Sequence, residues 1–513
     1  MTESRGLPNW IVRPDGEQEP FDAEKVFRAM FRAAGRLGAA DAFRARELSD
    51  AVLHFLAESG PGDAVGLDDF IDTVVKVVRE LGHPSLARTR AESTDLRAAD
   101  GGTVTDLFPA EILAAERAGL LALGDREHST VLAGSVVVPQ LPRGGNPSGM
   151  LQRLCEARGH TGGYVAIDGP EYLLPVTSGA AIVSDWVAEL REGLRRTGLR
   201  AVVNLNCRTP PPWAVAPSGG LFPSDSPAEI ALKRALVSRS LFDEISAGET
   251  GSIRIDWHIC ESDFEAGHRP QILHVCRRLP EGVPMTFVPD RPRRPVALAE
   301  GLDRNHPAVF SVVGMRIDGL ARYLAPTTTG QPGALLRAIP SLGSLARSAG
   351  HARLQYLRSH GGPGIDREFL LDRGRLLVVP LGLPSVARME LAHMAEEGDV
   401  QQQLLRAVLG GMSRFSSLGP PTVLDSAPPG SGLPSPEKAT ELAANVTPES
   451  QLRHAAALQG DTQTGTASIV LPTRFSTNAE DLAGLIEYAY RLPGLVRCRF
   501  VPPGPDSPTL AVV

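Results

Sequence analysis

Residues 10–26 read WIVRPDGEQEPFDAEKV, and this stretch determines how the N-terminal region folds. The apolar residues at 10–12 predict a short strand. Pro14-Asp15-Gly16 predicts a turn, because proline presets the backbone angle that a turn needs and glycine tolerates a positive φ. The chain then returns toward Phe21, which completes a β-hairpin. Asp22 follows at the position of a helix N-cap.

Three helices are expected after the hairpin. In each of them apolar residues recur at spacings of three and four, which places them on one face. The third helix is expected from about Asp68 to Leu81, with Gly82 as its stop. A β-hairpin with a helical bundle is therefore the predicted fold. The apolar positions are Val26, Phe27, Met30, Phe31 and Ala34, then Leu48, Val52, Phe55 and Leu56, then Phe70, Ile71, Val74, Val75 and Val78.

Two cations beside the hairpin suggest a site for an anion. Arg13 lies on the first strand, and Lys25 lies in the first turn of the first helix, where free backbone N–H groups already favour negative charge. Phosphate oxygens next to those groups would be held by both side chains. The alternative is a solvated helix face with an ordinary lysine, which is the commoner arrangement for an isolated lysine.

The N-terminal region resembles an ATP-cone, the allosteric ATP/dATP-binding module of ribonucleotide reductases and of their transcriptional repressor. The matching residues are Val12-Arg13-Pro14-Asp15-Gly16, Glu19-Pro20-Phe21-Asp22 and Lys25-Val26, within about residues 9–93. The resemblance implies ATP or dATP as effector, with Arg13 and Lys25 on the phosphates and Ile11 and Val12 beside the base. Pro14 replaces a usual second basic residue, and Leu86-Ala87-Arg88-Thr89-Arg90 replaces a tyrosine-rich end.

The composition is that of a soluble globular protein. The chain has 513 residues, of which 42% are hydrophobic, and a formal net charge of −7, so nucleic acid is an unlikely partner. No apolar run approaches the roughly 18 residues of a membrane span, and the N-terminus has no secretory core, so a cytoplasmic protein is expected. Only four of the 52 basic residues are lysines, which makes a lysine at position 25 informative.

The longer region, residues 105–513, alternates helices with short apolar strands. This alternation indicates βαβ units and a parallel or mixed sheet, and hence an α/β fold. A segment rich in proline, glycine and serine, about residues 424–440, is expected to form a flexible connection. The clearest strands are expected at 201–206, 252–258, 309–313 and 376–380, and the clearest helix at 227–246.

The five cysteines form no disulfide framework and no C-x-x-C motif. Two H-x-C pairs, His258-Ile259-Cys260 and His274-Val275-Cys276, would each place both side chains on one face of a strand, which is the arrangement that two pairs need to ligate a metal together. This spacing is less specific than paired C-x-x-C motifs. Small thiols in the core beside hydrogen-bonded histidines are the favoured interpretation, and no bound metal is predicted.

The order of short motifs along residues 105–500 resembles the anaerobic ribonucleoside-triphosphate reductases. The resemblance implies a divergent ten-stranded α/β barrel of the ribonucleotide reductase type behind the small ATP-cone. In that family a Cys-Arg pair on a central loop supplies the thiyl radical that takes hydrogen from the substrate ribose, and Cys276-Arg277 falls at the corresponding point. The matches are Asn204-Leu205-Asn206-Cys207, Phe242-Asp243-Glu244, residues 254–258, Cys276-Arg277-Arg278-Leu279 and residues 312–317.

Part of the family's chemistry has no counterpart in this sequence. Members end with four zinc-binding cysteines and a glycine that stores the radical, whereas residues 492–501 read LPGLVRCRFV. We therefore expect a nucleotide-binding, reductase-like protein that is divergent or catalytically incomplete and acts in nucleotide sensing.

Two alternatives stay open. One is an active reductase component that uses Cys276 while another chain supplies the glycyl radical. The other is an ATP-cone transcriptional regulator, although no zinc ribbon precedes the cone and no helix-turn-helix signature is evident. Nucleotides are the expected partners, and a second copy or a radical-bearing subunit are further candidates.

Overall fold

The fold is described by a computed structural model, in which the chain forms two compact units. Unit 1 comprises residues 1–122, 315–356 and 407–420, and unit 2 comprises residues 123–314, 357–406 and 421–513. Of the helices in the described residues, none has the length and apolar character of a membrane span. The described residues are 6–38, 40–60, 62–84, 86, 107–124, 126–138, 149–172, 179–215, 227–248, 251–279, 283–328, 333–362, 365, 370–383, 386, 403, 406–407, 420–433, 447–462, 465–472 and 478–501.

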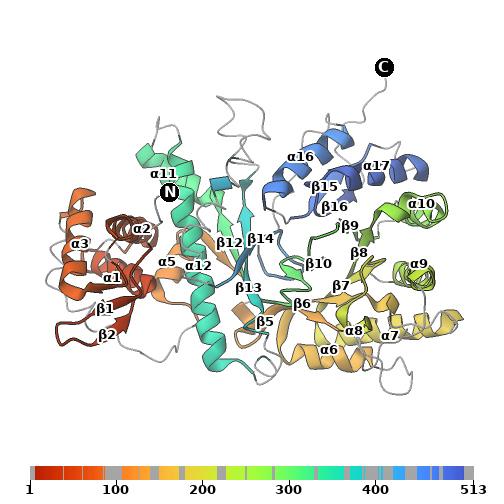
Figure 1. Cartoon of the computed structure of the whole chain (residues 1–513), viewed down its shortest axis with the longest axis horizontal. Coiled ribbons are helices and arrows are strands. Elements are labelled where there is room, and N and C mark those ends of the chain that lie inside the picture. Colours follow the sequence, from red (N-terminus) through yellow and green to blue (C-terminus); the bar gives the residue numbers. More distant parts are fainter. Residues whose placement is uncertain are drawn as a thin grey trace. The chain divides into compact units, whose positions relative to one another are not determined.

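Unit 1 begins with the predicted hairpin and helices (Figure 1). β1 (Trp10–Val12) pairs antiparallel with β2 (Gln18–Pro20), which confirms the hairpin. A third strand, β3 (Ala64–Gly66), pairs parallel with β1 and was not expected. The three helices are confirmed as α1 (Ala23–Arg36), α2 (Ala42–Ser59) and α3 (Leu67–Glu80). The Asp22 carboxylate accepts a hydrogen bond from the backbone N–H of Glu24 at 2.8 Å, so Asp22 caps α1 as predicted.

Helices from distant parts of the sequence complete unit 1. They are α5 (Ala110–Arg117), α11 (Ile317–Thr328) and the part of α12 (Ala334–His360) that precedes Leu357. Tyr323 of α11 packs edge-on against Phe43 with 5.3 Å between ring centroids, and its hydroxyl donates to Asp41 at 2.5 Å. The N-terminal fold is thus joined to helices almost three hundred residues further along the chain.

Unit 2 is built on one large mixed sheet. Five neighbouring strands, β5 to β9, run parallel and are connected by helices, so the βαβ prediction is confirmed. These strands are β5 (Leu132–Val137), β6 (Thr161–Asp168), β7 (Arg200–Leu205), β8 (Ile253–Ile259) and β9 (Met285–Pro289). The predicted strands at 201–206 and 252–258 are β7 and β8.

The remaining strands flank the parallel block on both sides. In the described residues the order is β14-β13-β12-β5-β6-β7-β8-β9-β16-β15, a path of ten strands, and β4 adds an eleventh beside β12. Both β12 next to β5 and β16 next to β9 run antiparallel to the central block. The flanking strands are β4 (Leu121–Leu123), β12 (Ala308–Arg316), β13 (Gly374–Leu381), β14 (Thr422–Leu424), β15 (Ala467–Val470) and β16 (Cys498–Val501).

The two ends of the strand path approach each other at Asp425. This residue follows β14, and its carboxylate accepts a hydrogen bond at 3.0 Å from the backbone N–H of Gly465, which precedes β15. It also pairs with Arg497, which precedes β16. The sheet therefore curves back on itself, as a barrel does. Asp425 lies in the segment expected to form a flexible connection, of which residues 434–440 lie outside the described ones.

A short hairpin lies against the sheet from within this curve. It consists of β10 (Ala297–Ala299) and β11 (Leu302–Asp303) and contacts β5, β6 and β7. Gly301 at its turn donates its backbone N–H to Asp425, and Arg375 of β13 donates to the Gly301 carbonyl. The hairpin thus contacts strands in the middle of the strand path and residues at its end. Because the sheet curves back on itself, these contacts place the hairpin inside the barrel. The hairpin residues 298–303 are buried.

Helices cover the outside of the sheet (Figure 1). Their apolar faces and the strands form one continuous core that includes Trp186, Phe242 and Trp257. The covering helices are α6 (Met150–Arg158), α7 (Gly179–Thr197), α9 (Pro227–Ser246), α10 (Arg269–Arg278), α16 (Pro448–Thr462) and α17 (Ala479–Arg491). The helix predicted at 227–246 is α9.

Candidate functional site

In unit 1, the two predicted phosphate-binding cations converge on one carboxylate. Arg13 follows β1 and donates to Glu19 from Nε at 3.1 Å and from Nη2 at 2.5 Å. Lys25, in the first turn of α1, donates from Nζ to the other oxygen of Glu19. The hydrogen bond from Lys25 lowers the pKa of Glu19, so this carboxyl is ionised at neutral pH. The structure thus shows a negatively charged carboxylate between Arg13 and Lys25.

The other two predicted contact residues lie on the strand that leads into this site. Ile11 and Val12 are half-buried on β1, where Ile11 pairs with Glu19 of β2. The hairpin and the first turn of α1 therefore bring together all four predicted residues. Sequence reasoning gave Glu19 no role of its own. The sequence spacing did hold a signal for this pairing. Glu19 lies six positions after Arg13, on the other side of the turn, and six positions before Lys25, which lies in the following helix.

In unit 2, the enclosed hairpin places a carboxylate inside the barrel. Glu300, at the turn of the hairpin, accepts from Arg254 of β8 at 2.6 Å and 3.0 Å. The same guanidinium donates to Asp256 at 2.8 Å. Although burial opposes the charged form, Asp256 and Glu300 raise the pKa of Arg254. Tyr164 of β6 donates its hydroxyl to the Glu300 carbonyl at 2.5 Å. The position inside the barrel is occupied by an ion-pair network.

Cys276 does not lie on a central loop, and the expectation of a loop-borne cysteine is wrong. It lies in α10, on the outside of the sheet, within the apolar core that includes Ile272 and Leu482. Burial raises the pKa of the Cys276 thiol to about 12. Arg277 is the next residue of the same helix, in its last turn. The weak match of Cys276-Arg277 to a reductase motif therefore coincides with a helix C-terminus, where arginine is favoured.

The two histidines considered for a metal are held by other partners. His258 binds Asp290 at 2.7 Å and Asn204 at 3.0 Å, whereas His274 binds Asp243 at 2.6 Å. His274 and Cys276 lie on a helix, where positions i and i+2 do not share a face. Within the described ranges, no group of three or more His, Cys, Asp or Glu residues is arranged to hold a metal ion.

A cavity of about 480 Å³ opens beside the enclosed hairpin and is rich in arginine. Three of its carboxylates pair locally, since Asp290 binds His258, Asp303 binds Arg375 and Asp425 binds Arg497. Its rim includes the exposed loop Pro292-Arg293-Arg294-Pro295, where Arg293 has a left-handed φ of 68°. A bulky residue in this backbone region is strained, as is common where a loop presents side chains to a ligand. The cavity suits an anionic ligand.

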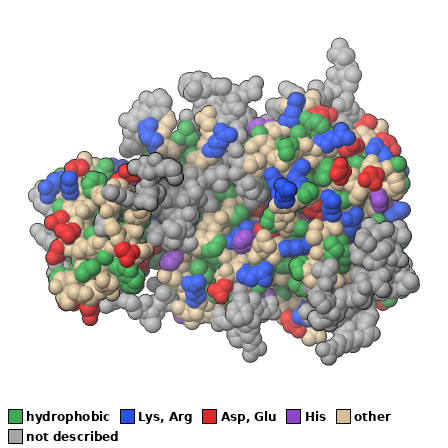
Figure 2. Space-filling view, in the orientation of Figure 1, with side chains coloured by type: hydrophobic (Ala, Val, Ile, Leu, Met, Phe, Trp, Pro, Cys, Tyr) green, Lys and Arg blue, Asp and Glu red, His purple; other side chains and the backbone are tan. Residues whose placement is uncertain are grey.

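Acidic and basic side chains are interspersed over the face of the molecule in Figure 2. The visible described residues form no single basic stripe of the kind that follows a nucleic-acid backbone.

A buried polar cluster lies at the ends of β6 and β7. Glu171 accepts the backbone N–H of Cys207 at 2.9 Å, and Tyr172 donates its hydroxyl to the Cys207 carbonyl at 2.7 Å. Between β7 and Cys207, Asn206 has a positive φ of 62°. Burial raises the pKa of Glu171 to about 7. This carboxyl therefore changes its charge near neutral pH.

The raised pKa of Glu171 predicts a pH-dependent stability. Because the folded-state pKa of about 7 lies above the ordinary glutamate value of 4.5, the stability that neutral Glu171 confers on the fold is fully present below pH 4.5 and is lost as the pH rises through 7. Over this pH range the free energy of unfolding is expected to fall by about 3 kcal/mol. Urea unfolding at several pH values should show a flatter profile for Glu171→Gln than for the wild type. The exposed Glu265→Gln is the control, and equal profiles for Glu171→Gln and the wild type would contradict the assignment.

Comparison with known proteins identifies the N-terminal module. Residues 10–99 match the family model described as the ATP cone domain. The sequence-based recognition of an ATP-cone is thus confirmed. Comparison with curated proteins gave no significant match.

Over most of its length the chain has the fold of an anaerobic ribonucleotide reductase. The Thermotoga maritima enzyme with glycerol in the active site superimposes with a TM-score of 0.58 at 11% identity, over 94% of this chain and 91% of that chain. Its complex with dATP and CTP gives 0.56 at 10% identity, over 94% and 92%. Its structure with dATP in the specificity site gives 0.55 at 10% identity, over 94% and 92%. The predicted fold class is therefore confirmed.

Proposed function

We propose that the protein binds ATP or dATP as an effector in the N-terminal module, through Arg13 and Lys25 on the phosphates and Ile11 and Val12 beside the base. The observation that carries this proposal is the convergence of Arg13 and Lys25 on a single carboxylate at the start of α1. A phosphate group has the same charge sign and hydrogen-bonding pattern as that carboxylate. The positive end of the α1 helix dipole adds to the attraction.

We propose further that the barrel is catalytically incomplete and that the protein acts in nucleotide sensing. Two observations support this. The enclosed hairpin presents Glu300, which is held by Arg254, and Cys276 lies in the core outside the sheet. A thiyl radical requires a cysteine sulfur, which a glutamate does not supply. The arginine-rich cavity retains the electrostatics of a nucleotide site, since its charges suit phosphate groups.

Two measurements on the full chain test these proposals. Isothermal titration calorimetry should show binding of ATP or dATP, and no heat with either nucleotide at millimolar concentration would refute the effector site. An anaerobic assay with CTP or ATP, a reductant and a lysate that contains a radical-bearing partner should yield no deoxynucleotide. If product forms and disappears in Cys276→Ala while ATP binding persists, the protein is instead an active reductase component.

Glu19 competes with phosphate, and its removal should strengthen nucleotide binding. The Glu19→Gln variant keeps the shape of the side chain but releases both cations from their ion pairs, so the affinity for ATP is expected to rise about fivefold to tenfold. Titration calorimetry of the full chain gives the affinity. Glu17→Gln is the matched control, because Glu17 is an exposed carboxylate of the same hairpin. Weaker binding by Glu19→Gln would mean that Glu19 assists the ligand.

A further inference from the structure

We propose that Arg46 is a positioning residue that transmits occupancy of the nucleotide site to helix α12. This inference rests on the proposed effector site, and all residues concerned belong to unit 1. The transmission runs from the first turn of α1, through Arg46 of α2, to Ser348 of α12.

The first step is the connection between the nucleotide site and Glu24. Glu24 is adjacent to Lys25 in the first turn of α1, and its backbone N–H is held by the Asp22 cap. Any ligand that draws Lys25 away from Glu19 acts on this same turn. Because the turn is capped and hydrogen-bonded, Lys25 and Glu24 are expected to move together.

The second step is the buried bridge formed by Arg46. Its side chain is 4% exposed, and it donates to Glu24 at 2.9 Å, to Asp50 at 2.9 Å and to the hydroxyl of Ser348 at 2.8 Å. Its guanidinium also lies over the ring of Phe27, 5.2 Å from the centroid. One buried cation thus connects α1, α2 and α12.

The third step concerns the rigidity of this bridge. Arg46 has two carboxylate partners, and the loss of Glu24 would leave only Asp50 to offset its charge in a medium of low dielectric constant, which is unfavourable. When the first turn of α1 shifts, Arg46 is therefore expected to follow Glu24 and to carry its bond to Ser348 with it. In α12 the Ser348 hydroxyl also donates to the carbonyl of Ser344 at 3.1 Å, so the displacement reaches the backbone of this helix.

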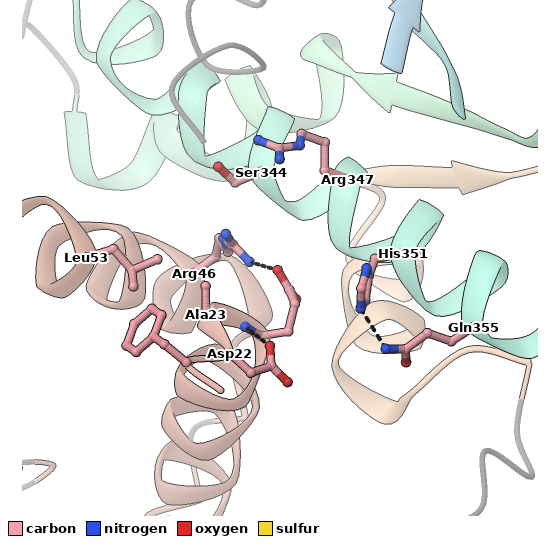
Figure 3. A pocket seen from close by; sticks show the side chains of 10 residues that line it. Asp22, Ala23, Arg46, Leu53, Ser344, Arg347, His351 and Gln355 are labelled. Atoms are coloured by element: carbon pink, nitrogen blue, oxygen red, sulfur yellow. Dashed lines mark hydrogen bonds and ion pairs between the residues drawn. The ribbon is translucent and has the colours of Figure 1, made fainter. Parts of the chain in front are cut away.

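A cavity next to the bridge provides room for such a displacement (Figure 3). Its volume is about 280 Å³, and neither Arg13 nor Lys25 lines it, so it is distinct from the nucleotide site. Figure 3 shows Asp22 and Arg46 on one side of the space and His351 and Gln355 of α12 on the other. Close-packed interiors resist small shifts, whereas a cavity lets one side chain move without a clash. The α1 side of the bridge can therefore change position relative to α12.

Hydrogen–deuterium exchange of the full chain, with and without ATP, tests the proposal. In the wild type, ATP should protect residues 10–36 and should shift the exchange rates of α12 amides around Ser344–Gln355 by about fivefold. The variant Ser348→Ala removes the hydroxyl that accepts from Arg46 and hydrogen-bonds to Glu24, while the ion pairs of Arg46 with Glu24 and Asp50 remain. It should retain the protection of residues 10–36 and reduce the shift in α12 to below about twofold.

Tyr323→Phe is the matched control. It removes the hydrogen bond from Tyr323 to Asp41, which also joins the N-terminal module to the following helices but does not include Arg46. It should behave as the wild type. The role of Arg46 would be overturned if ATP shifted the exchange rates of α12 in Ser348→Ala as much as in the wild type. It would also be overturned if ATP protected residues 10–36 of the wild type without changing the exchange rates of α12. Absence of protection at residues 10–36 would instead count against the effector site itself.

Discussion

Replacing Arg497 with methionine is expected to lower the free energy of unfolding by about 3–5 kcal/mol. Arg497 is 1% exposed, and its Nη2 donates to both oxygens of Asp425 at 2.6 Å and 2.5 Å. The substitution keeps most of the side-chain volume but leaves Asp425 buried without its cation. The cost is large because the desolvated carboxylate then has only neutral hydrogen-bond donors.

The consequences of this substitution extend beyond one ion pair. Asp425 also accepts the backbone N–H groups of Gly301 and Gly465, so it holds the enclosed hairpin and the start of β15 against the end of β14. Loss of Arg497 should therefore weaken the closure of the barrel as a whole. Urea unfolding followed by circular dichroism measures the change.

The exposed neighbour Arg499 provides the control for this experiment. Arg499→Met, two positions further along β16, should change stability by less than about 0.5 kcal/mol. The double variant Arg497→Met, Asp425→Leu should regain only part of the loss, because no buried charge is left unpaired but the backbone N–H groups of Gly301 and Gly465 lose their acceptor. A cost for Arg497→Met as small as that of Arg499→Met would show that Asp425 does not depend on this cation.

Replacing Lys25 with alanine is expected to weaken ATP binding by about tenfold to a hundredfold. The ammonium group would lose a charge-assisted hydrogen bond to phosphate, a contact that contributes about 1.5–3 kcal/mol. Lys25 is only 29% exposed, so its interaction is less screened by solvent than that of a fully exposed lysine. Titration calorimetry of the full chain measures the affinity directly.

Lys76→Ala is the control for the Lys25 variant. Lys76 lies on α3 with its ammonium 5.6 Å from the centroid of the Phe55 ring, and it has no part in the proposed site. Its replacement should leave the affinity for ATP unchanged. If Lys25→Ala binds ATP as tightly as Lys76→Ala does, the phosphates do not lie at the start of α1.

The N-terminal module was predictable from sequence because its signals are local. The Pro14-Asp15-Gly16 turn and the Asp22 cap each determine the backbone over a few residues, and the apolar spacing of the helices does the same over one or two turns. The parallel strand β3 was missed because it is three residues long, and its pairing with β1 spans more than fifty positions. Short strands of this kind leave little periodicity to detect.

The interior of the barrel was not predictable for a different reason. The placement of Glu300 depends on a hairpin that the surrounding sheet encloses, and its partner Arg254 is 46 positions away. For Cys276 the sequence did indicate a helix. Pro270 in the first turn and the Arg277-Arg278 pair in the last turn are typical of a helix, which excludes a loop at this point.

The pairing of Glu19 with both cations has a consequence for the concentration range in which the module can respond. A carboxylate tethered within the same hairpin competes with free nucleotide at an effective concentration on the order of millimolar. Nucleotide binding is then an exchange of one anion for another, and it becomes favourable only when the free nucleotide outcompetes the tethered group. If the proposed effector site is correct, Glu19 raises the nucleotide concentration at which the module becomes half-occupied.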